Sequence, residues 1–132
     1  MEDNGIFGRA IAACDALTEV QDDLTREMVT HLADKWSLWT MAVLADAGGP
    51  MRFSRVMEKV EGVSQKSLTK TLRQLERDGM VTRTVFAEVP PRVEYAMTEL
   101  GGEMLEHVEP LWMWVAKSVG RFQAARAAFD SR

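Results

Sequence analysis

The stretch that decides the fold runs from Gly62 to Tyr95 and reads GVSQKSLTKTLRQLERDGMVTRTVFAEVPPRVEY. In its first half, Leu68, Leu72 and Leu75 recur at helical spacing, so they share one face of a helix. Four cations share another face of the same helix: Lys66, Lys70, Arg73 and Arg77. The pattern predicts a helix with one packed face and one positively charged face. An ordinary solvated helix has the same pattern, so the neighbouring segments must decide its role.

A β-hairpin is predicted directly after this helix. Residues 80–86 (MVTRTVF) are rich in β-branched side chains and alternate as a strand does, and residues 93–97 (VEYAM) are the predicted partner. The connection at residues 87–92 (AEVPPR) contains two prolines, which have no amide hydrogen to donate to a sheet. We therefore expect a stiff loop that presents Arg92 outward, which is the form of a wing.

A second short helix is predicted before the charged one. Residues 53–60 (FSRVMEKV) give it an apolar side, residues 61–63 (EGV) form a tight turn, and Ser64 is the predicted N-cap of the next helix. Two short helices joined by a glycine-containing turn form a helix-turn-helix. The predicted fold class is therefore α+β, mostly α: a winged helix-turn-helix with a two-stranded wing and additional N- and C-terminal dimerisation helices.

The N-terminal segment has a heptad seam with Asn4 as its predicted N-cap. The seam residues are spaced alternately four and three apart: Ile6, Ala10, Ala13, Leu17, Val20 and Leu24. Such a helix either pairs with a second subunit or lies on its own core, and we interpret residues 1–24 as a dimerisation helix. A further helical run reaches Leu32, and a third helix ends at residues 47–50 (AGGP).

A long apolar helix is predicted at the C-terminal side. Thr98 is its predicted N-cap, and its apolar residues continue to Phe122. Pro110 lies inside the run and should kink or break it, since an interior proline costs roughly 3 kcal/mol. We predict a winged-helix domain over residues 25–122, which includes this helix, and a frayed tail over residues 123–132.

Charge is unevenly distributed along the chain. The 132 residues include 16 Lys or Arg and 20 Asp or Glu, and the net charge of −4 alone argues against a polyanionic partner. Residues 52–95, however, hold nine cations and six acids, an excess of three positive charges, so the remainder carries −7. This segregation predicts one basic face and an acidic back, a dipole that would orient the molecule towards a phosphate backbone.

Other classes of protein fit the composition less well. No apolar run approaches the roughly 20 residues of a membrane span, and Glu2 and Asp3 occupy the place of a leader's cations, so we expect a cytoplasmic protein. The single cysteine, Cys14, excludes an internal disulfide, and His31 and His107 are isolated, so neither a metal nor a cofactor is predicted. No catalytic set is recognisable, which argues against an enzyme.

Several segments together resemble the HxlR-type transcriptional regulators, relatives of the MarR group. The most specific are SQKSLTKTLRQLERDG at residues 64–79 and EVPPRVEY at residues 88–95, which occur in register. LADKW at residues 32–36 and TELG at residues 98–101 add to a similarity that covers residues 24–115. The resemblance implies a bacterial, homodimeric regulator that binds double-stranded DNA and whose subunits join through terminal helices.

The resemblance also assigns DNA contacts by position. The helix that enters the major groove would present six residues: Ser64, Gln65, Lys66, Thr69, Lys70 and Arg73. Gln65 and Thr69 are the candidates for base edges, and the three cations are candidates for phosphates or guanine. Arg52 would contact the DNA backbone, and Arg92 would reach phosphate or the minor groove from the wing tip. Ser64 has a second interpretation, as a helix cap.

Cys14 and the tryptophans each have two interpretations. Many relatives have a Cys-Pro pair, whose cysteine can sense redox state, where this chain has Asp23-Leu24, so that role does not transfer to Cys14. Cys14 could still meet its twin across a dimer seam, and the alternative is a buried, unreactive thiol. Three tryptophans either line a pocket for a small apolar effector or belong to the core: Trp36, Trp39 and Trp112.

These observations predict a homodimer on a pseudo-palindromic operator, with half-sites about 10 bp apart centre to centre if the recognition helices enter successive grooves. Repression is favoured over activation, because blocking a promoter requires only occupancy. One alternative is a winged helix that serves as a protein-interaction scaffold. The other is a regulator switched through the thiol of Cys14.

Overall fold

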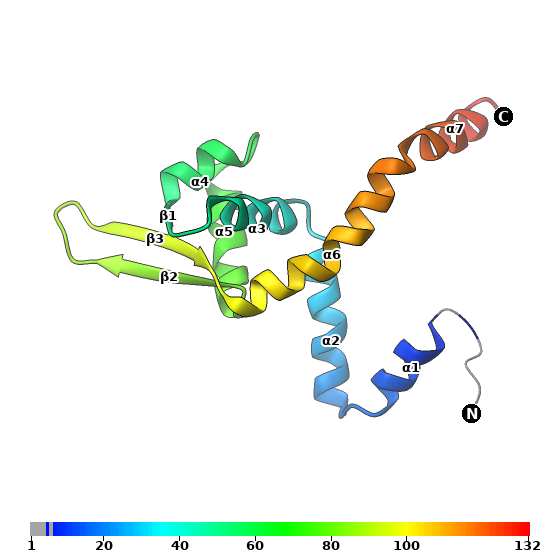
Figure 1. The fold of residues 1–132 in the computed structure, drawn as a ribbon, viewed down its shortest axis with the longest axis horizontal. Coiled ribbons are helices and arrows are strands. Elements are labelled where there is room, and N and C mark those ends of the chain that lie inside the picture. Colours follow the sequence, from blue (N-terminus) through cyan, green and yellow to red (C-terminus); the bar gives the residue numbers. More distant parts are fainter. Residues whose placement is uncertain (1–4, 6) are drawn as a thin grey trace.

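The computed structural model describes residue 5 and residues 7–132. Figure 1 shows a central body from which three parts project: a hairpin, a helical arm at the N-terminal side and a second helical arm at the C-terminal side. The predicted cap Asn4 and the seam residue Ile6 lie outside the described residues. Within the described part of the chain, no helix is both long and apolar enough to span a bilayer.

The central body combines three helices with a small antiparallel sheet. Its elements have these bounds: α3 Lys35–Ala47, β1 Met51–Arg52, α4 Phe53–Lys59, α5 Gln65–Arg77, β2 Val81–Phe86 and β3 Arg92–Met97. The strand order is β1-β3-β2, so the predicted two-stranded hairpin is joined by a third, two-residue strand. The mostly helical winged helix-turn-helix is confirmed, and β1 is an addition to the prediction.

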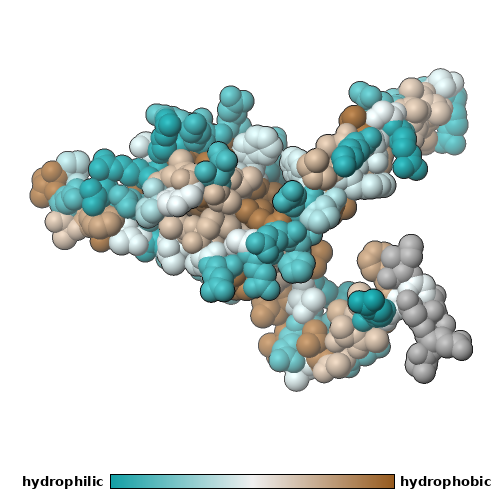
Figure 2. All heavy atoms as spheres, viewed as in Figure 1, coloured by the Kyte–Doolittle hydropathy of each residue, from teal (hydrophilic) through white to brown (hydrophobic). Residues whose placement is uncertain are grey.

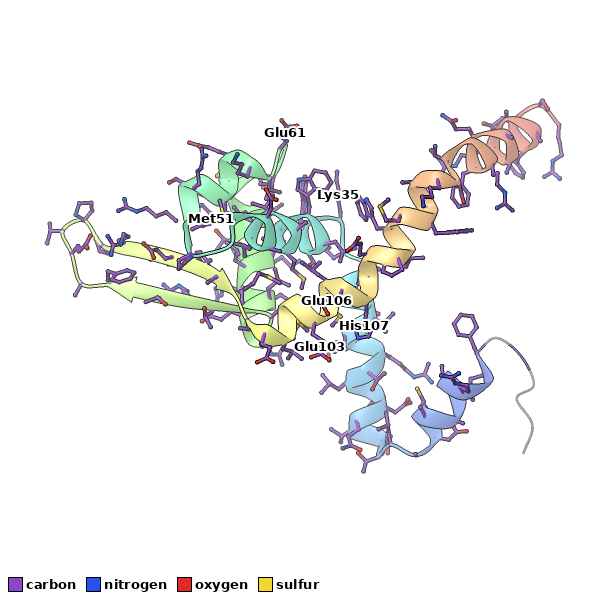
Figure 3. All side chains as sticks on the ribbon, viewed as in Figure 1. Lys35, Met51, Glu61, Glu103, Glu106 and His107 are labelled. Atoms are coloured by element: carbon purple, nitrogen blue, oxygen red, sulfur yellow. The ribbon has the colours of Figure 1, made fainter. Side chains whose placement is uncertain are left out.

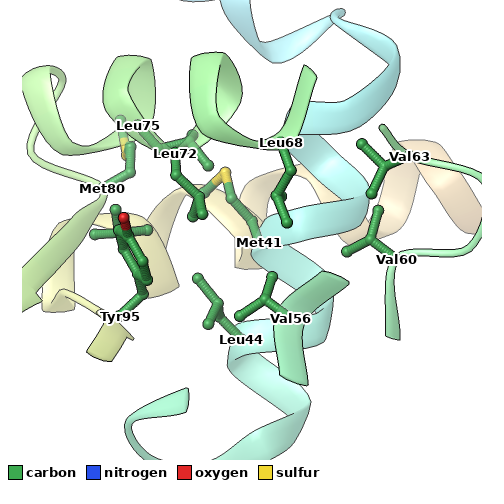
Figure 4. Packing of buried hydrophobic residues seen from close by; sticks show 11 residues of the cluster. Met41, Leu44, Val56, Val60, Val63, Leu68, Leu72, Leu75, Met80 and Tyr95 are labelled. Carbon is green, nitrogen blue, oxygen red and sulfur yellow. The ribbon is translucent and has the colours of Figure 1, made fainter. Parts of the chain in front are cut away.

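The core of the body lies between α3, α4, α5 and the sheet (Figure 4). Leu68, Leu72 and Leu75 point from α5 into this core, as their spacing predicted, and meet Met41 and Leu44 of α3. Burial of one such side chain contributes about 1.5–3 kcal/mol. The leucine face therefore holds α5 against α3 and leaves the opposite face of α5 in solvent.

Polar side chains cap two of the three helices of the body, α3 and α5. Asp34 Oδ2 accepts hydrogen bonds from the backbone N–H groups of Trp36 and Ser37 at 3.1 and 3.3 Å, and so caps α3. Ser64 Oγ accepts one from the N–H of Ser67 at 3.0 Å, which confirms the predicted cap of α5. These bonds satisfy amides that a helix leaves unpaired in its first turn.

α6 (Glu99–Lys117) leaves the sheet at a tight junction. Thr98 caps it, as predicted: Oγ1 accepts from the N–H of Gly101 at 3.0 Å and donates to the carbonyl of Gly79 at 2.6 Å. A Cβ atom at Gly101 would overlap the carbonyl oxygen of Met80, so α6 can approach this closely only with glycine there. The junction ties the start of α6 to the residues that follow α5.

The N-terminal arm is two helices, and the prediction of one continuous heptad helix is wrong. α1 spans Gly8–Asp15, α2 spans Glu19–Leu32, and α2 crosses the boundary predicted between residues 24 and 25. Thr18 and Gln21 form a capping box: the Gln21 N–H donates to Thr18 Oγ1 at 3.2 Å, and the Thr18 N–H donates to Gln21 Oε1 at 3.0 Å. This capping box starts a new helix at Glu19, although the heptad spacing of the apolar residues continues through it.

The C-terminal arm continues further as helix than predicted. Of the two predicted effects of Pro110, a kink or a break, the break is absent, because α6 runs through Pro110 and the helix is interrupted only later, at Ser118. Pro110 and Glu106, whose carbonyl loses its helical donor, both face solvent, so water can take the place of the missing bond. α7 then spans Val119–Asp130, so the tail predicted to fray is helical, consistent with its content of alanine and arginine.

Both arms expose apolar side chains along much of their length (Figure 2). On the N-terminal arm these are Phe7, Ile11, Leu17, Val20, Leu24 and Val29. On the C-terminal arm they are Leu100, Leu111, Trp112, Met113, Trp114, Val115, Val119, Phe122 and Phe129. So many exposed apolar side chains on two neighbouring segments are typical of a surface that contacts another macromolecule. The arms therefore have the character of an interface, whereas the body has its own core.

The packed face of α5 yields a stability prediction. Leu72 is fully buried, and Leu72→Ala should lower the free energy of unfolding by about 2–5 kcal/mol because it leaves a cavity between α5 and α3. Val85, 53% exposed on β2 and outside both arms, is the control, and Val85→Ala should cost less than about 1 kcal/mol. Urea unfolding followed by circular dichroism at one fixed protein concentration measures both. Equal losses would contradict this description of the core.

Candidate nucleic-acid interface

The solvent face of α5 carries five of the residues predicted to contact DNA. All five are exposed, on the side of the helix opposite the leucines: Gln65, Lys66, Thr69, Lys70 and Arg73. Among the described residues, none of the three cations in this set of five takes part in an ion pair. The face therefore offers unpaired positive charge, one amide and one hydroxyl to a ligand.

Ser64 lies directly before the first residue of α5 and caps this helix. Its hydroxyl oxygen already accepts the hydrogen bond from the Ser67 amide, so the cap interpretation of Ser64 is confirmed. The helix N-terminus that it closes carries a partial positive charge, which favours a nearby phosphate. Ser64 thus positions the beginning of α5 whether or not its side chain touches DNA.

The other end of α5 is braced by a contact that the sequence analysis missed. Asp78, the C-cap of α5, places Oδ2 at 2.9 Å from Nδ1 of His31 at the end of α2, and its Oδ1 accepts from Gln74 Nε2 at 3.1 Å. The second ring nitrogen of His31 lies 3.6 Å from Glu27 Oε1. The contact links the N-terminal arm directly to α5. No local sequence pattern predicts the contact between Asp78 and His31, because the two residues are far apart in sequence.

The side chain of Arg92 in the wing has other surroundings than predicted. Arg92 begins β3 and lies within ion-pair distance of two glutamates, with Nη1 at 3.3 Å from Glu88 Oε1 and Nε at 3.2 Å from Glu94 Oε2. Its guanidinium also stacks 4.0 Å above the ring of Phe86, its partner across the hairpin. The prediction that Arg92 points outward from the loop is wrong, because Phe86 across the hairpin, Glu88 in the loop and Glu94 on the same strand all lie around it. Arg83 on β2 is the exposed cation of this hairpin.

Arg52 lies at the entrance to α4, as expected from its place before the helix-turn-helix. It is exposed, belongs to β1, and is the residue directly before the first turn of α4. It shares a hollow of about 600 Å³ with Arg55 and Lys59 of α4. Arg55 is paired with Glu58 at 2.9 Å, so Arg52 and Lys59 are the cations of this hollow that have no ion pair among the described residues.

Two of the three tryptophans predicted to line a pocket come together. The rings of Trp39 on α3 and Trp112 on α6 have their centroids 6.2 Å apart with an interplanar angle of 46°, and both line a cavity of about 580 Å³ between these helices. Trp36 does not line this cavity. It lies on another side of α3, with Lys35 Nζ at 4.7 Å from the centre of its ring.

Cys14 is half-buried on α1, where it borders a hollow shared with Asp22 and Arg26 of α2. Arg26 Nε donates to Asp22 Oδ2 at 3.1 Å, and this hydrogen bond, together with the attraction of the two charges, raises the pKa of Arg26. Over residue 5 and residues 7–132, no three side chains of His, Cys, Asp or Glu gather in a group that could hold a metal ion.

Comparison with known proteins agrees with this geometry. Residues 31–122 match the family model described as HxlR-like helix-turn-helix. The uncharacterized HTH-type transcriptional regulator YtfH of Escherichia coli strain K12 is 35% identical over 102 residues, which cover 77% of this chain and 79% of YtfH.

Solved structures show the same fold. The putative transcriptional regulator ytfH from Salmonella typhimurium has a TM-score of 0.68 at 35% identity, over 78% of this chain and 90% of that one. The redox regulator HypR in its oxidized form has a TM-score of 0.61 at 31% identity, over 70% of this chain and 94% of HypR. With the family model matching most of its length, the chain belongs to the HxlR-like helix-turn-helix family of transcriptional regulators.

Proposed function

We propose that this regulator is a homodimer that reads a pseudo-palindromic operator in double-stranded DNA and represses transcription from it. The observation that carries the proposal is the solvent face of α5, where cations without ion-pair partners flank an amide and a hydroxyl on a helix anchored by its leucines. Affinity for DNA comes largely from cations that displace counterions, and sequence preference from side chains at base edges. The cytoplasm, where chromosomal DNA lies in a bacterium, is the proposed place of action.

The residues of α5 divide into two roles in this proposal. Gln65 is suited to read bases, because its amide can bond both N6 and N7 of adenine, and Thr69 can bond a base or contact the methyl group of thymine. Lys66, Lys70 and Arg73 supply phosphate contacts or recognise guanine. Arg52 adds a contact to the DNA backbone at the entrance to α4.

Arg92 is left out of the DNA contacts, although the sequence pattern placed it there. To reach a phosphate it would have to leave Glu88 and Glu94, two carboxylates already beside its guanidinium. Its contacts instead stiffen the hairpin from within. We propose that Arg83, exposed on β2, provides the positive charge of the wing.

The dimer is proposed from the two arms. Burying the apolar side chains that α1, α2, α7 and the end of α6 beyond Trp112 expose would remove from water the surface that one chain alone leaves uncovered. A twofold axis between two such chains would place the two α5 helices in successive major grooves, about 10 bp apart. Repression needs no more than this occupancy.

Base reading by Gln65 can be tested by selection from random double-stranded DNA, read by sequencing. The wild-type protein should enrich an inverted repeat, and Gln65→Ala should retain binding but lose preference at one position of each half-site, because its amide contacts a base edge. Recovery of no motif by the wild type would contradict sequence-specific binding and favour the protein-interaction scaffold. An unchanged motif with Gln65→Ala would remove this residue from base recognition.

Phosphate contact by Lys66 makes a separate prediction about salt. If the dimer makes about eight phosphate contacts, the logarithm of the binding constant should fall with the logarithm of salt concentration with a slope near −7. Lys66→Ala should weaken binding to all sequences and make the slope shallower by about 2, one contact from each subunit. Lys117→Ala, on α6, is the control and should leave the slope unchanged. Fluorescence anisotropy over a salt series measures both variants.

The thiol-switch alternative is supported by one relative, because HypR is described as a redox regulator in an oxidized form. Cys14 is the single cysteine of this chain and is half-buried, so a disulfide would have to join two subunits. We expect wild type and Cys14→Ser to bind the selected operator equally, with and without a thiol oxidant. A loss of wild-type binding under oxidant that Cys14→Ser resists would establish the switch instead.

A further inference from the structure

The cavity between α3 and α6 is formed by two helix faces that meet through small residues. Ala42 and Ala45 line it from α3, and Gly102 lines it from α6. A Cβ atom added at Gly102 would meet no atom within 4 Å, so the space in front of this residue is open. Larger side chains here would fill the space between the helices, whereas the small ones leave about 580 Å³ open.

Aromatic walls border the cavity. Trp39 and Trp112 remain 45% and 50% exposed, although their rings are neighbours, because each turns a side towards the open space. The faces of tryptophan rings attract cations through their quadrupole, and they also bury large apolar groups. The walls alone would suit either a neutral or a positively charged aromatic ligand.

The charge of the residues that line the cavity favours the positively charged ligand over the neutral one. Three carboxylates border the cavity, Asp46 from α3 and Glu106 and Glu109 from α6, and the lining contains no lysine or arginine. Figure 3 shows Glu106 on α6 where this helix passes the body. In the part of the chain that the structure describes, none of the three acids is in an ion pair. These carboxylates are exposed, and they would attract a cation bound beside them, whereas a neutral ligand would gain no such attraction.

We propose that the cavity between α3 and α6 is an effector site for a lipophilic organic cation, whose aromatic or alkyl groups lie against Trp39 and Trp112 while its charge faces the three carboxylates. α3 packs against α5 in the shared core, and α6 is the first helix of the C-terminal arm. A ligand in the cavity would therefore contact both the DNA-binding body and the proposed dimer arm. The effector role rests on the proposed DNA-binding function. The chemical selectivity of the site does not.

A pair of ions of equal shape and opposite charge tests the selectivity. Tetraphenylphosphonium and tetraphenylborate are titrated into the full-length protein without DNA, and binding is measured by calorimetry and by equilibrium dialysis. The phosphonium ion should bind at least about tenfold more tightly, because the acids attract it and repel the borate. Equal affinities, or tighter binding of the borate, would overturn the proposal.

Matched variants locate the site. Gly102→Leu places a side chain in the open space and should abolish phosphonium binding, whereas Gly120→Leu, on α7, where an added Cβ also meets no atom, should leave it unchanged. Trp39→Leu should weaken binding, whereas Trp114→Leu, 51% exposed outside the cavity, should not. Glu106→Gln combined with Glu109→Gln should narrow the difference between the two ions. Loss of binding in the controls alone would place the ligand elsewhere and overturn the assignment.

Two further outcomes are decisive. If Gly102→Leu changes the oligomeric state in sedimentation while the wild type binds neither ion, a second copy of the chain occupies the cavity and the proposal fails. Saturating phosphonium ion should change operator affinity in the wild type and not in Gly102→Leu; binding without any such change would refute the effector role. An inability of the ligand-free protein to bind any DNA would count against the proposed function and leave the ion measurements intact.

Discussion

The packing of the α5 leucines against α3 is the interaction on which the rest of the structure depends. Leu68 and Leu72 are fully buried against Met41 and Leu44, and a helix that buries one face in this way has no freedom to rotate. The opposite face must then be turned to solvent, with its cations and its amide in a fixed order. The surface proposed to meet DNA is thus a consequence of where the core lies.

Both ends of α5 are held by polar contacts that reach outside the helix-turn-helix. At its start Ser64 closes the first turn, and at its end Asp78 meets His31 of the N-terminal arm. Directly beyond, Thr98 joins the start of the C-terminal arm to Gly79. The two arms proposed to form the dimer are therefore attached at the same end of α5. A change in how they pair would be transmitted to the helix that carries the base-reading residues.

The same construction leaves a cavity where the body and the C-terminal arm face each other. α3 serves the core with Met41 and Leu44 and the cavity with Trp39 and Ala42, because successive residues of a helix point in different directions. A ligand beside Trp39 would act on a helix whose other side supports α5. Any regulation through this site would require the ligand to favour one arrangement of body and arm over another.

Local pattern in the sequence alone determined α5 with its two faces, the cap at Ser64, the hairpin and the family, because each follows from spacing over a few residues. The helix break before Thr18 also had a local signal in the sequence, the capping pair Thr18 and Gln21. The heptad spacing of the apolar residues continues across this pair and led to the prediction of one helix. Only the tertiary structure decided that β1 joins the sheet, that Asp78 meets His31, and that Trp39 meets Trp112. These features depend on which distant residues the folded core brings together, and no periodicity along the chain encodes such distances.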